Sequence, residues 1–258
     1  MIITTAGRTN KEMVIRAKQI GIELGLTYVH RNKRSVQAIM EIEQADCIVV
    51  SKNRMELYPY GETEPFFFHP NSSMFRVKRL KKGESDPFVE AAQLELGMSV
   101  LDCTLGLASD SIVASYSVGF TGKIIGIEAN PFLAFIVQQG LQSWQSGMDE
   151  MDEAMRNISV IQGHSLEVMR TLADDSVDCV YFDPMFEESI LESDGIRNLT
   201  KFARIEGISD NMISEALRIA RKRIILKDHY RSPRFAQFNF KVYKRKSAKF
   251  HFGVIEKT

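Results

Sequence analysis

Apolar positions between about residue 98 and residue 230 alternate between two kinds of spacing. Short aliphatic, β-branched runs are separated by segments in which apolar side chains recur every three or four residues. Such runs are typical of strands buried on both faces of a parallel sheet, and the segments between them are typical of helices that cover those faces. Five strands are predicted in this way, at residues 99–103, 123–128, 158–162, 177–183 and 223–227.

The same pattern predicts the helices and a final hairpin. Helices are expected near residues 110–117, 130–143, 165–172 and 210–220. The second of these begins at Asn130-Pro131, where Asn can cap the exposed amides and Pro suits the first helical position. Beyond residue 230, two alternating segments rich in aromatic and β-branched residues, 238–243 and 249–255, predict an antiparallel hairpin at the edge of the sheet.

The first 85 residues predict a smaller α/β domain. Its expected elements are a strand at 2–5, helices near 10–24 and 36–43, a strand at 47–51, and strand-like pieces around 55–60 and 65–69. The stretch Lys82-Gly83-Glu84-Ser85-Asp86-Pro87 has the composition of a boundary. We therefore expect domains at 1–85 and 86–258, the smaller one available for substrate recognition.

Composition excludes several classes of protein. The 258 residues are 44% hydrophobic and 26% charged, and no apolar run approaches the ~18 residues of a membrane span. The N-terminus lacks a basic segment followed by an apolar one, as a secretion signal requires. Cys47, Cys103 and Cys179 are widely spaced, which predicts reduced core thiols, no zinc site and a cytoplasmic location.

The net charge of zero conceals unlike regions. Residues 91–200 hold 4 Lys and Arg against 17 Asp and Glu, whereas residues 201–258 hold 15 against 5. The basic C-terminal region can supply phosphate contacts to a nucleic acid, or it can neutralise the acidic middle of the same protein. Charge alone favours neither interpretation.

The first candidate site follows the strand at 99–103. The chain there reads Asp102-Cys103-Thr104-Leu105-Gly106-Leu107-Ala108-Ser109-Asp110, an acidic strand end, a turn and the start of a helix. This arrangement places backbone amides at the edge of a parallel sheet where α/β folds bind nucleotides. A dinucleotide fingerprint needs three glycines, and the single glycine here disfavours a pyrophosphate cofactor. An ordinary turn between strand and helix is the alternative for this segment alone.

Two further strand ends carry polar residues. Glu128 ends the next strand 22 positions after Gly106, where a carboxylate can accept both hydroxyls of a ribose. His164 and Ser165 follow the strand at 158–162 and can line an adenine site, although His164 can equally be a neighbour of a helix cap. Together with the Asp102 loop, these residues favour an adenosine-type ligand.

The most informative segment is Asp183-Pro184-Met185-Phe186, at the end of a predicted buried strand. An Asp-Pro-x-aromatic group at such an edge suits methylation of an exocyclic amine. The carboxylate and the carbonyl beside Pro184 can accept the amine hydrogens, and the ring of Phe186 can stack on a base. A strand-ending turn with a core phenylalanine is the alternative, which the upstream loops make less favoured.

With these motifs the chain resembles class I S-adenosylmethionine (SAM)-dependent methyltransferases over residues 85–230. The Asp102–Asp110 loop and Asp183-Pro184-Met185-Phe186 are most similar to the bacterial family that methylates guanine at its exocyclic amine in small-subunit ribosomal RNA. The resemblance implies a Rossmann-like α/β fold with a mostly parallel seven-stranded sheet, SAM as cofactor and an RNA substrate. It also implies that no membrane is involved.

The resemblance also implies roles for individual residues. Cofactor contacts are expected from Ser109, Asp110, Glu128, Ala129, His164, Ser165 and Asp183, with Asp102 and Gly106 shaping the pocket. The amine nitrogen would attack the sulfonium methyl in line, with Asp183, Pro184 and Phe186 positioning the base. Lys227, near the end of a later strand, can meet a phosphate or the base edge, or form a structural ion pair with Asp228.

Three other functions remain open at this stage. A methyltransferase for a small molecule or protein would suit Glu187-Glu188, which follow Phe186 and would repel phosphate. An RNA-binding accessory protein that has lost activity is disfavoured by the retained Asp102, Glu128 and Asp183. A nicotinamide-dependent oxidoreductase is disfavoured by the missing glycines.

Overall fold

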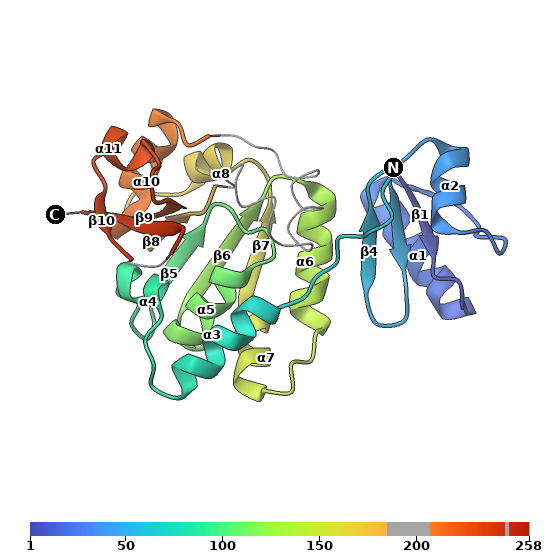
Figure 1. Cartoon of the computed structure of the whole chain (residues 1–258), viewed down its shortest axis with the longest axis horizontal. Coiled ribbons are helices and arrows are strands. Elements are labelled where there is room, and N and C mark those ends of the chain that lie inside the picture. Colours follow the sequence, from blue (N-terminus) through green and yellow to red (C-terminus); the bar gives the residue numbers. More distant parts are fainter. Residues whose placement is uncertain (185–206, 246–247, 258) are drawn as a thin grey trace. The chain divides into compact units, whose positions relative to one another are not determined.

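The computed structural model describes residues 1–184, 207–245 and 248–257. These residues form two compact units (Figure 1), and the chain passes from the first to the second between His69 and Pro70. Each unit has a mostly parallel sheet and its own buried core. No helix among these residues is both long enough and apolar enough to cross a membrane.

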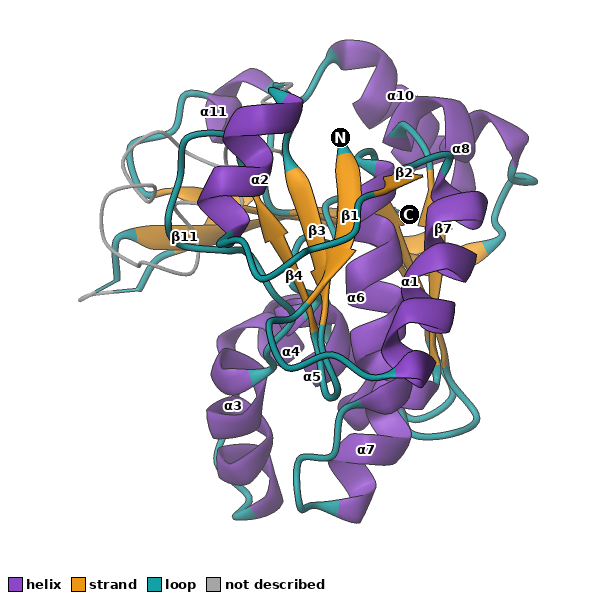
Figure 2. Ribbon diagram, turned by 90° about the vertical axis from the view of Figure 1, so that its right-hand side faces the viewer, coloured by secondary structure: helices purple, strands orange, loops and turns teal. Residues whose placement is uncertain are grey.

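The N-terminal unit is a four-stranded sheet with two helices. Its elements are β1 (Ile2–Thr5), α1 (Lys11–Leu24), β2 (Thr27–Tyr28), α2 (Val36–Glu43), β3 (Cys47–Val50) and β4 (Met55–Tyr58). The strand order is β2-β1-β3-β4, and only β4 is antiparallel to its neighbour. The chain moves from β1 outward to β2 and then back past β1 to β3. Right-handed crossovers in these two directions place α1 and α2 on opposite faces of the sheet. Figure 2 shows β1 and β3 between α2 and α1.

Local sequence explains the ends of these elements. Asn10 caps α1 by accepting a hydrogen bond from the Met13 amide, and Gly25 ends the helix with a φ of 67°. The strand expected at 65–69 is wrong, because the structure has only an isolated bridge between Leu57 and Phe66 there. On one side of this bridge the next amide to donate would be that of residue 59, which is a proline without an amide hydrogen.

The larger unit contains the seven-stranded sheet that the sequence predicted. Its strands are β5 (Ser99–Asp102), β6 (Lys123–Glu128), β7 (Ile158–Gln162), β8 (Val177–Phe182), β9 (Ala220–His229), β10 (Lys241–Tyr243) and β11 (Phe250–Glu256). The order is β10-β11-β9-β8-β5-β6-β7. β11 runs antiparallel to both of its neighbours and all other pairs are parallel. The fold is therefore Rossmann-like, and the predicted hairpin is confirmed with its second strand inserted beside β9.

Helices cover both faces of this sheet. They are α3 (Asn71–Lys81), α4 (Pro87–Ala92), α5 (Ser109–Val118), α6 (Pro131–Ser143), α7 (Asp149–Arg156), α8 (Ser165–Thr171), α10 (Asp210–Ile219) and α11 (Arg234–Gln237). From β5 the chain moves outward through β6 to β7, so α5 and α6 lie on one face of the sheet. From β7 it returns to β8 on the other side of β5, which places α8 on the opposite face. There α8 packs on α10. As predicted, Asn130 caps α6, accepting from the amides of Phe132 and Leu133.

The boundary between the units lies earlier than the position expected near residue 85. Helix α3 packs on α5, and Arg76 of α3 forms ion pairs with Asp86 and Asp110. These contacts connect residues 70–85 to the larger unit. The polar composition at 82–87 marks the turn between α3 and α4 instead.

Candidate active site

The carboxyl ends of four strands bring charged side chains to one edge of the large sheet. Asp102 ends β5, Glu128 ends β6, Asp183 directly follows β8, and Lys227 lies near the end of β9. β5 is central, and the chain leaves it toward β6 on one side and later returns to β8 on the other. Such a reversal of strand order opens a crevice at the carboxyl edge, which is the usual ligand site of open α/β sheets.

The loop after β5 is held by its own backbone and by its neighbours. The Cys103 amide continues the ladder to the Tyr181 carbonyl at 2.9 Å, and the Leu105 amide donates to the Ile127 carbonyl at 3.0 Å. The side chain of Leu105 is 3% exposed and packs directly on Gly126, at a site where a Cβ would lie only 2.3 Å from its Cδ1. A glycine in β6 therefore makes room for the leucine in the loop, and Gly106 turns the chain with a φ of 49°.

Asp102 organises the start of this loop from a buried position. Its Oδ1 accepts from the Thr104 amide at 3.0 Å, and its Oδ2 accepts from the Ser111 hydroxyl at 2.6 Å. Burial raises the pKa of Asp102 to about 7, although these hydrogen bonds favour the ionised form. Asp102 is 2% exposed, so it holds the start of the loop from below the surface.

Glu128 occupies the position expected of a ribose acceptor. It is partly exposed, and its Oε1 accepts from the Asn130 amide at 2.9 Å. Burial raises the pKa of Glu128, while the amides of Asn130, Gly106 and Ala129 act in the opposite direction. Backbone amides of the loop after β5 and of the turn after β6 therefore orient the Glu128 carboxylate. Its oxygens can still accept further hydrogen bonds from hydroxyl groups.

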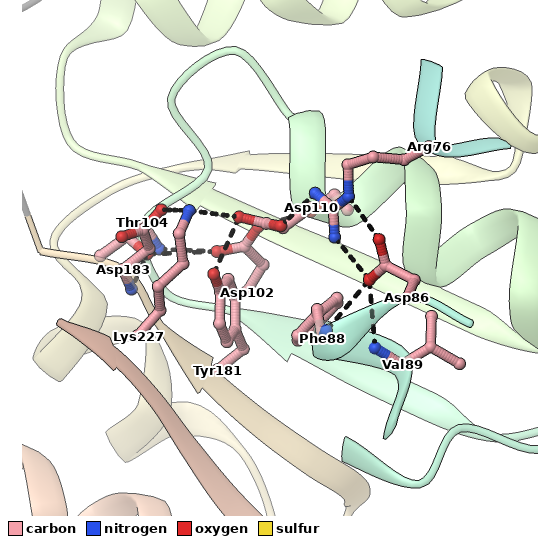
Figure 3. A network of polar contacts seen from close by, with 11 residues as sticks. Arg76, Asp86, Phe88, Val89, Asp102, Thr104, Asp110, Tyr181, Asp183 and Lys227 are labelled. Atoms are coloured by element: carbon pink, nitrogen blue, oxygen red, sulfur yellow. Dashed lines mark hydrogen bonds and ion pairs between the residues drawn. The ribbon is translucent and has the colours of Figure 1, made fainter. Parts of the chain in front are cut away.

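Asp183 and Lys227 form the charged centre of the edge (Figure 3). The Lys227 ammonium donates to Asp183 Oδ2 at 2.6 Å and to Asp110 Oδ2 at 3.1 Å. The Asp183 amide donates to the Thr104 hydroxyl at 2.7 Å, so the end of β8 is joined to the loop after β5. The side chain of Asp183 keeps 25% of its surface exposed, compared with 9% for Asp110.

Asp110 is held on its other side by two groups that sequence reasoning missed. Arg76 donates to Oδ1 at 2.5 Å, and the Tyr181 hydroxyl donates to Oδ2 at 2.8 Å (Figure 3). Arg76 also binds both oxygens of Asp86, which caps α4 through the amide of Phe88. A chain of polar contacts thus extends from the start of α4 to Asp183.

Burial and the charges in this network of polar contacts together shift the pKa values of Asp110 and Asp183 in opposite directions. Burial would raise the pKa of Asp110, but the charges of Lys227 and Arg76 outweigh it and hold the pKa well below its usual range. Burial raises the pKa of Asp183 to about 6, against the attraction of Lys227. Burial would lower the pKa of Lys227, but Asp110 and Asp183 together raise it. Asp110 is therefore held as an anion, whereas the pKa of Asp183 lies above its ordinary value.

The expected pair of Lys227 with Asp228 is wrong. Successive side chains of a strand point to opposite faces of the sheet. The side chains of Lys227 and Asp228 therefore point away from each other. Asp228 is 1% exposed and accepts from Arg234 at 2.7 Å and from Ser232 at 2.6 Å. Lys227 points instead toward the crevice.

The remaining predicted residues lie around the same edge. Ala129 and Ser109 are partly exposed, and His164 precedes α8 with its carbonyl accepting the Val168 amide. The Ser165 hydroxyl donates to the Cys103 carbonyl at 2.5 Å, which joins the end of β7 to the loop. Pro184 is buried, and Phe186 lies outside the described residues.

Asp110 differs from the expectation of direct cofactor contact. Its oxygens accept from Arg76, Tyr181 and Lys227, and it is 8% exposed. The sequence singled out Asp110 only by its place in the loop after β5. Its three partners lie on α3, β8 and β9, which are distant from Asp110 in the sequence. The structure places Asp110 as a support for Lys227.

Comparison with known proteins agrees with this geometry. A family model described as SAM-dependent methyltransferase matches residues 33–254, which is most of the chain. The chain belongs to the SAM-dependent methyltransferases. Its cofactor is accordingly SAM, as the resemblance at the Asp102 loop implied.

Individual relatives of the methyltransferase vary in their similarity. YpiP of Bacillus subtilis (strain 168), described as an uncharacterized protein, is 48% identical over 255 residues and 99% of both chains. Ribosomal RNA small subunit methyltransferase J of Alteromonas mediterranea is 30% identical over 165 residues, covering 62% of this chain and 61% of that protein. The corresponding protein of Buchnera aphidicola is 24% identical and covers 70% and 74%.

A solved structure shows the same fold. A SAM-dependent methyltransferase from Neisseria gonorrhoeae aligns with 99% of this chain and 96% of its own, at a TM-score of 0.64 and 17% identity. At this identity the likeness concerns the fold, including both units of this methyltransferase.

The donor set at the edge fits SAM. The half-buried carboxylate of Glu128 could accept hydrogen bonds from the two hydroxyls of a ribose, and a glycine at position 106 would allow a ligand to approach the loop backbone closely. Among the described residues, no group of three or more His, Cys, Asp or Glu side chains is arranged to hold a metal ion. The crevice of this methyltransferase thus has the chemistry of an adenosine site.

Proposed function

We propose that this methyltransferase transfers a methyl group to an exocyclic amine of a base, the N2 of guanine, in small-subunit ribosomal RNA. The observation that carries the proposal is Asp183, a partly exposed carboxylate held by Lys227 at the carboxyl edge and followed by Pro184. Support also comes from relatives whose names specify the small-subunit ribosomal RNA. The motif suits an amine substrate because the Asp183 carboxylate and the Pro184 carbonyl can each accept a hydrogen bond from an N–H group of the amine.

SAM supplies a methyl group that is already activated as a sulfonium, so positioning accounts for most of the acceleration. Asp183 accepts one amine hydrogen and the carbonyl of Pro184 accepts another, which directs the nitrogen lone pair at the methyl carbon. Bound SAM would supply the methyl group, with S-adenosylhomocysteine as the leaving product, and the methylated amine would then have one proton to give up. Asp183, with a pKa of about 6, takes this proton and passes it to solvent.

The cofactor contacts are part of the same proposal. Glu128 would bind the ribose hydroxyls, Ala129 and His164 would flank the adenine, and Ser109 would meet the amino-acid part of SAM. Ser165 would act through the loop, since its hydroxyl binds the Cys103 carbonyl. Phe186 remains the predicted stacking partner of the base.

The experiment is methyl transfer from labelled SAM to small-subunit ribosomal RNA, both free and in assembled subunits, with the product nucleoside identified by mass spectrometry. We expect N2-methylguanosine from the unmodified protein and a loss of about 100-fold or more in Asp183→Asn. Asp174→Asn is the matched control, because Asp174 is 74% exposed and precedes β8. Methylation of another nucleoside, or none, contradicts the proposed substrate.

We also propose that the N-terminal unit contributes to substrate selection. Its sheet and core are separate from the crevice that holds Asp183 and Glu128. Substitution of exposed basic residues there, such as Lys11→Gln, should raise the KM for RNA and leave the affinity for SAM unchanged. An unchanged KM across such a series contradicts this role.

A further inference from the structure

The basic residues of the C-terminal region separate into two groups along β9, β10 and β11. The first group lies near the amino end of β9 and faces the acidic residues just before and at the start of β8. Three ion pairs join the two: Arg218 with Asp174, Arg221 with Asp178, and Lys257 with Asp175. This group neutralises the acidic middle of the chain, which was one of the two expectations from charge.

The second group lies at the opposite end of the same strands. Because β11 is antiparallel to β9, its first residue, Phe250, pairs with His229, the last residue of β9. Tyr230 and Arg231 follow β9, and Arg245 follows β10 at the same end. These side chains therefore share the carboxyl edge of the sheet with Asp183.

Lys227 connects this group directly to the candidate active site. Its ammonium lies 2.6 Å from Asp183 and 5.0 Å from the centre of the Phe250 ring. The guanidinium of Arg245 lies 4.7 Å from the same ring centre, and that of Arg231 lies 5.0 Å from the ring centre of Tyr230. Lys227 and Arg245 thus share the Phe250 ring, and Arg231 lies against the Tyr230 ring.

Two of these residues are available to a partner. Tyr230 is 43% exposed, and Arg231 is exposed. Over the ranges that the structure describes, neither Arg231 nor Arg245 forms an ion pair with an acidic side chain. Their charge is therefore not cancelled within the described part of the protein, in contrast to the group at the amino end.

The backbone holds this group in place. Asp228 is buried and accepts hydrogen bonds from the His229 amide, the Ser232 hydroxyl and Arg234, which closes the turn carrying Tyr230. The Tyr230 amide also donates to the Lys249 carbonyl at 3.0 Å. A surface built in this way loses little conformational entropy when it binds.

We propose that Tyr230, Arg231, Arg245 and Phe250, here called the aromatic-basic surface, bind the single-stranded RNA that flanks the target base. This inference rests on the proposed function and assigns the place where its substrate docks. A base stacks on the exposed Tyr230 ring, Phe250 holds Arg245 against its own ring, and the guanidinium groups meet phosphates, a combination typical of single-strand binding. Single strands are required because a duplex hides the faces of its bases.

The test measures binding of a fluorescein-labelled 15-nucleotide single-stranded RNA by anisotropy over a series of salt concentrations. Tyr230→Ala should bind about tenfold more weakly, because one stacked base is lost. Arg231→Gln should weaken binding and reduce the slope of log affinity against log salt by about one phosphate contact. Tyr230→Trp should bind as well as the unmodified protein, which separates stacking from damage to the fold.

Matched controls come from the larger unit. Phe120→Ala removes an aromatic ring that is 89% exposed at the amino edge of the sheet, and Arg170→Gln removes an exposed guanidinium on α8. Both controls should bind the RNA as the unmodified protein does. Tyr230→Ala should also bind heparin normally, since heparin has charges but no bases.

Calorimetry with SAM and methyl transfer to ribosomal RNA distinguish the possible failures. Unchanged RNA binding in both surface variants, with normal SAM binding, overturns the aromatic-basic surface and leaves the proposed function intact. Equal loss of RNA and heparin binding in Tyr230→Ala overturns the stacking role. Failure of the unmodified protein to methylate ribosomal RNA, with the surface variants still defective in binding, contradicts the proposed function alone.

Discussion

Lys227 sets the charge state of the residue nearest the chemistry. It is the cation shared by Asp110 and Asp183, and it opposes the rise that burial causes in the pKa of Asp183. Arg76 and Tyr181 hold Asp110 on the far side, so Lys227 has a fixed anchor. The pKa of Asp183 therefore depends on Lys227, which is held in turn by Asp110.

Replacement of Lys227 by Met should move the pH dependence of methyl transfer. Without the ammonium, the pKa of Asp183 should rise above about 6, because burial and Asp110 both favour its neutral form. We expect the acidic midpoint of the single-turnover rate to rise by about one pH unit. Lys227→Arg keeps the charge and should leave the midpoint close to its original position. An unmoved midpoint in Lys227→Met would contradict this role.

Asp102 should make the folded state less stable as the pH rises from about 4 to about 7. The folded protein retains the proton of Asp102 up to a pKa of about 7, whereas the unfolded chain releases it near the ordinary value of 3.8. Across this window the unfolded state binds fewer protons, so the free energy of unfolding falls with increasing pH. Asp102→Asn should reduce this fall by an amount on the order of a few kcal/mol.

Urea denaturation at pH 5 and pH 7.5 measures this effect. Asp174→Asn, at an exposed position, should keep the original difference between the two pH values. An equal difference in Asp102→Asn and in the unmodified protein would show that Asp102 is not the group responsible.

Among the secondary-structure elements, the loop after β5 and the neighbouring strand β6 depend on each other. The side chain of Leu105 occupies the space left by the missing Cβ of Gly126. A close-packed interior has little room for an added methyl group, so either residue limits what the other can be. This contact determines where the loop between Asp102 and Gly106 lies.

Gly126→Ala should therefore destabilise the protein and weaken SAM binding. The new Cβ would lie 2.3 Å from Leu105 Cδ1 and 3.0 Å from its Cγ, which forces the leucine and its loop to move. We expect a loss of about 1–3 kcal/mol in the free energy of unfolding. The double variant Leu105→Ala with Gly126→Ala should lose less than the sum of the two single variants. Additive losses in a double-mutant cycle would contradict the proposed contact.

At the scale of the whole molecule, the two units have separate cores. The N-terminal core consists of residues of β1, α2 and β3, whereas a core of the larger unit is formed by residues of β5, β6, β8, β9, α8 and α10. The residues assigned to SAM all belong to the larger unit. Binding should consequently stabilise one unit and not the other.

Differential scanning calorimetry of the full chain should show two transitions, of which SAM shifts one. At a SAM concentration 100 times the Kd, the expected stabilisation is about 2.7 kcal/mol for the larger unit. NAD should shift neither transition, and Glu128→Ala should reduce the shift caused by SAM. A single transition that moves as a whole would contradict the independence of the units.

Much of the fold was predictable because parallel strands leave a local signal. Strands buried on both faces form uninterrupted apolar runs, and the five predicted in this way correspond to β5, β6, β7, β8 and β9. Asn130 marked the start of α6 because capping involves only the next few residues. Helices α3 and α4 were not predicted.

The sequence by itself determined that Asp102, Glu128 and Asp183 lie at the same edge of the sheet, because parallel strands bring their carboxyl ends together there. Only the tertiary structure decided which cation pairs with Asp183. Lys227 is 44 residues away from Asp183 in the sequence, and Arg76 is 34 residues away from Asp110. The tertiary structure also decided which basic residues face the site, because this depends on the reversal of β11. Ion pairs between distant segments follow from packing, and no local pattern encodes them.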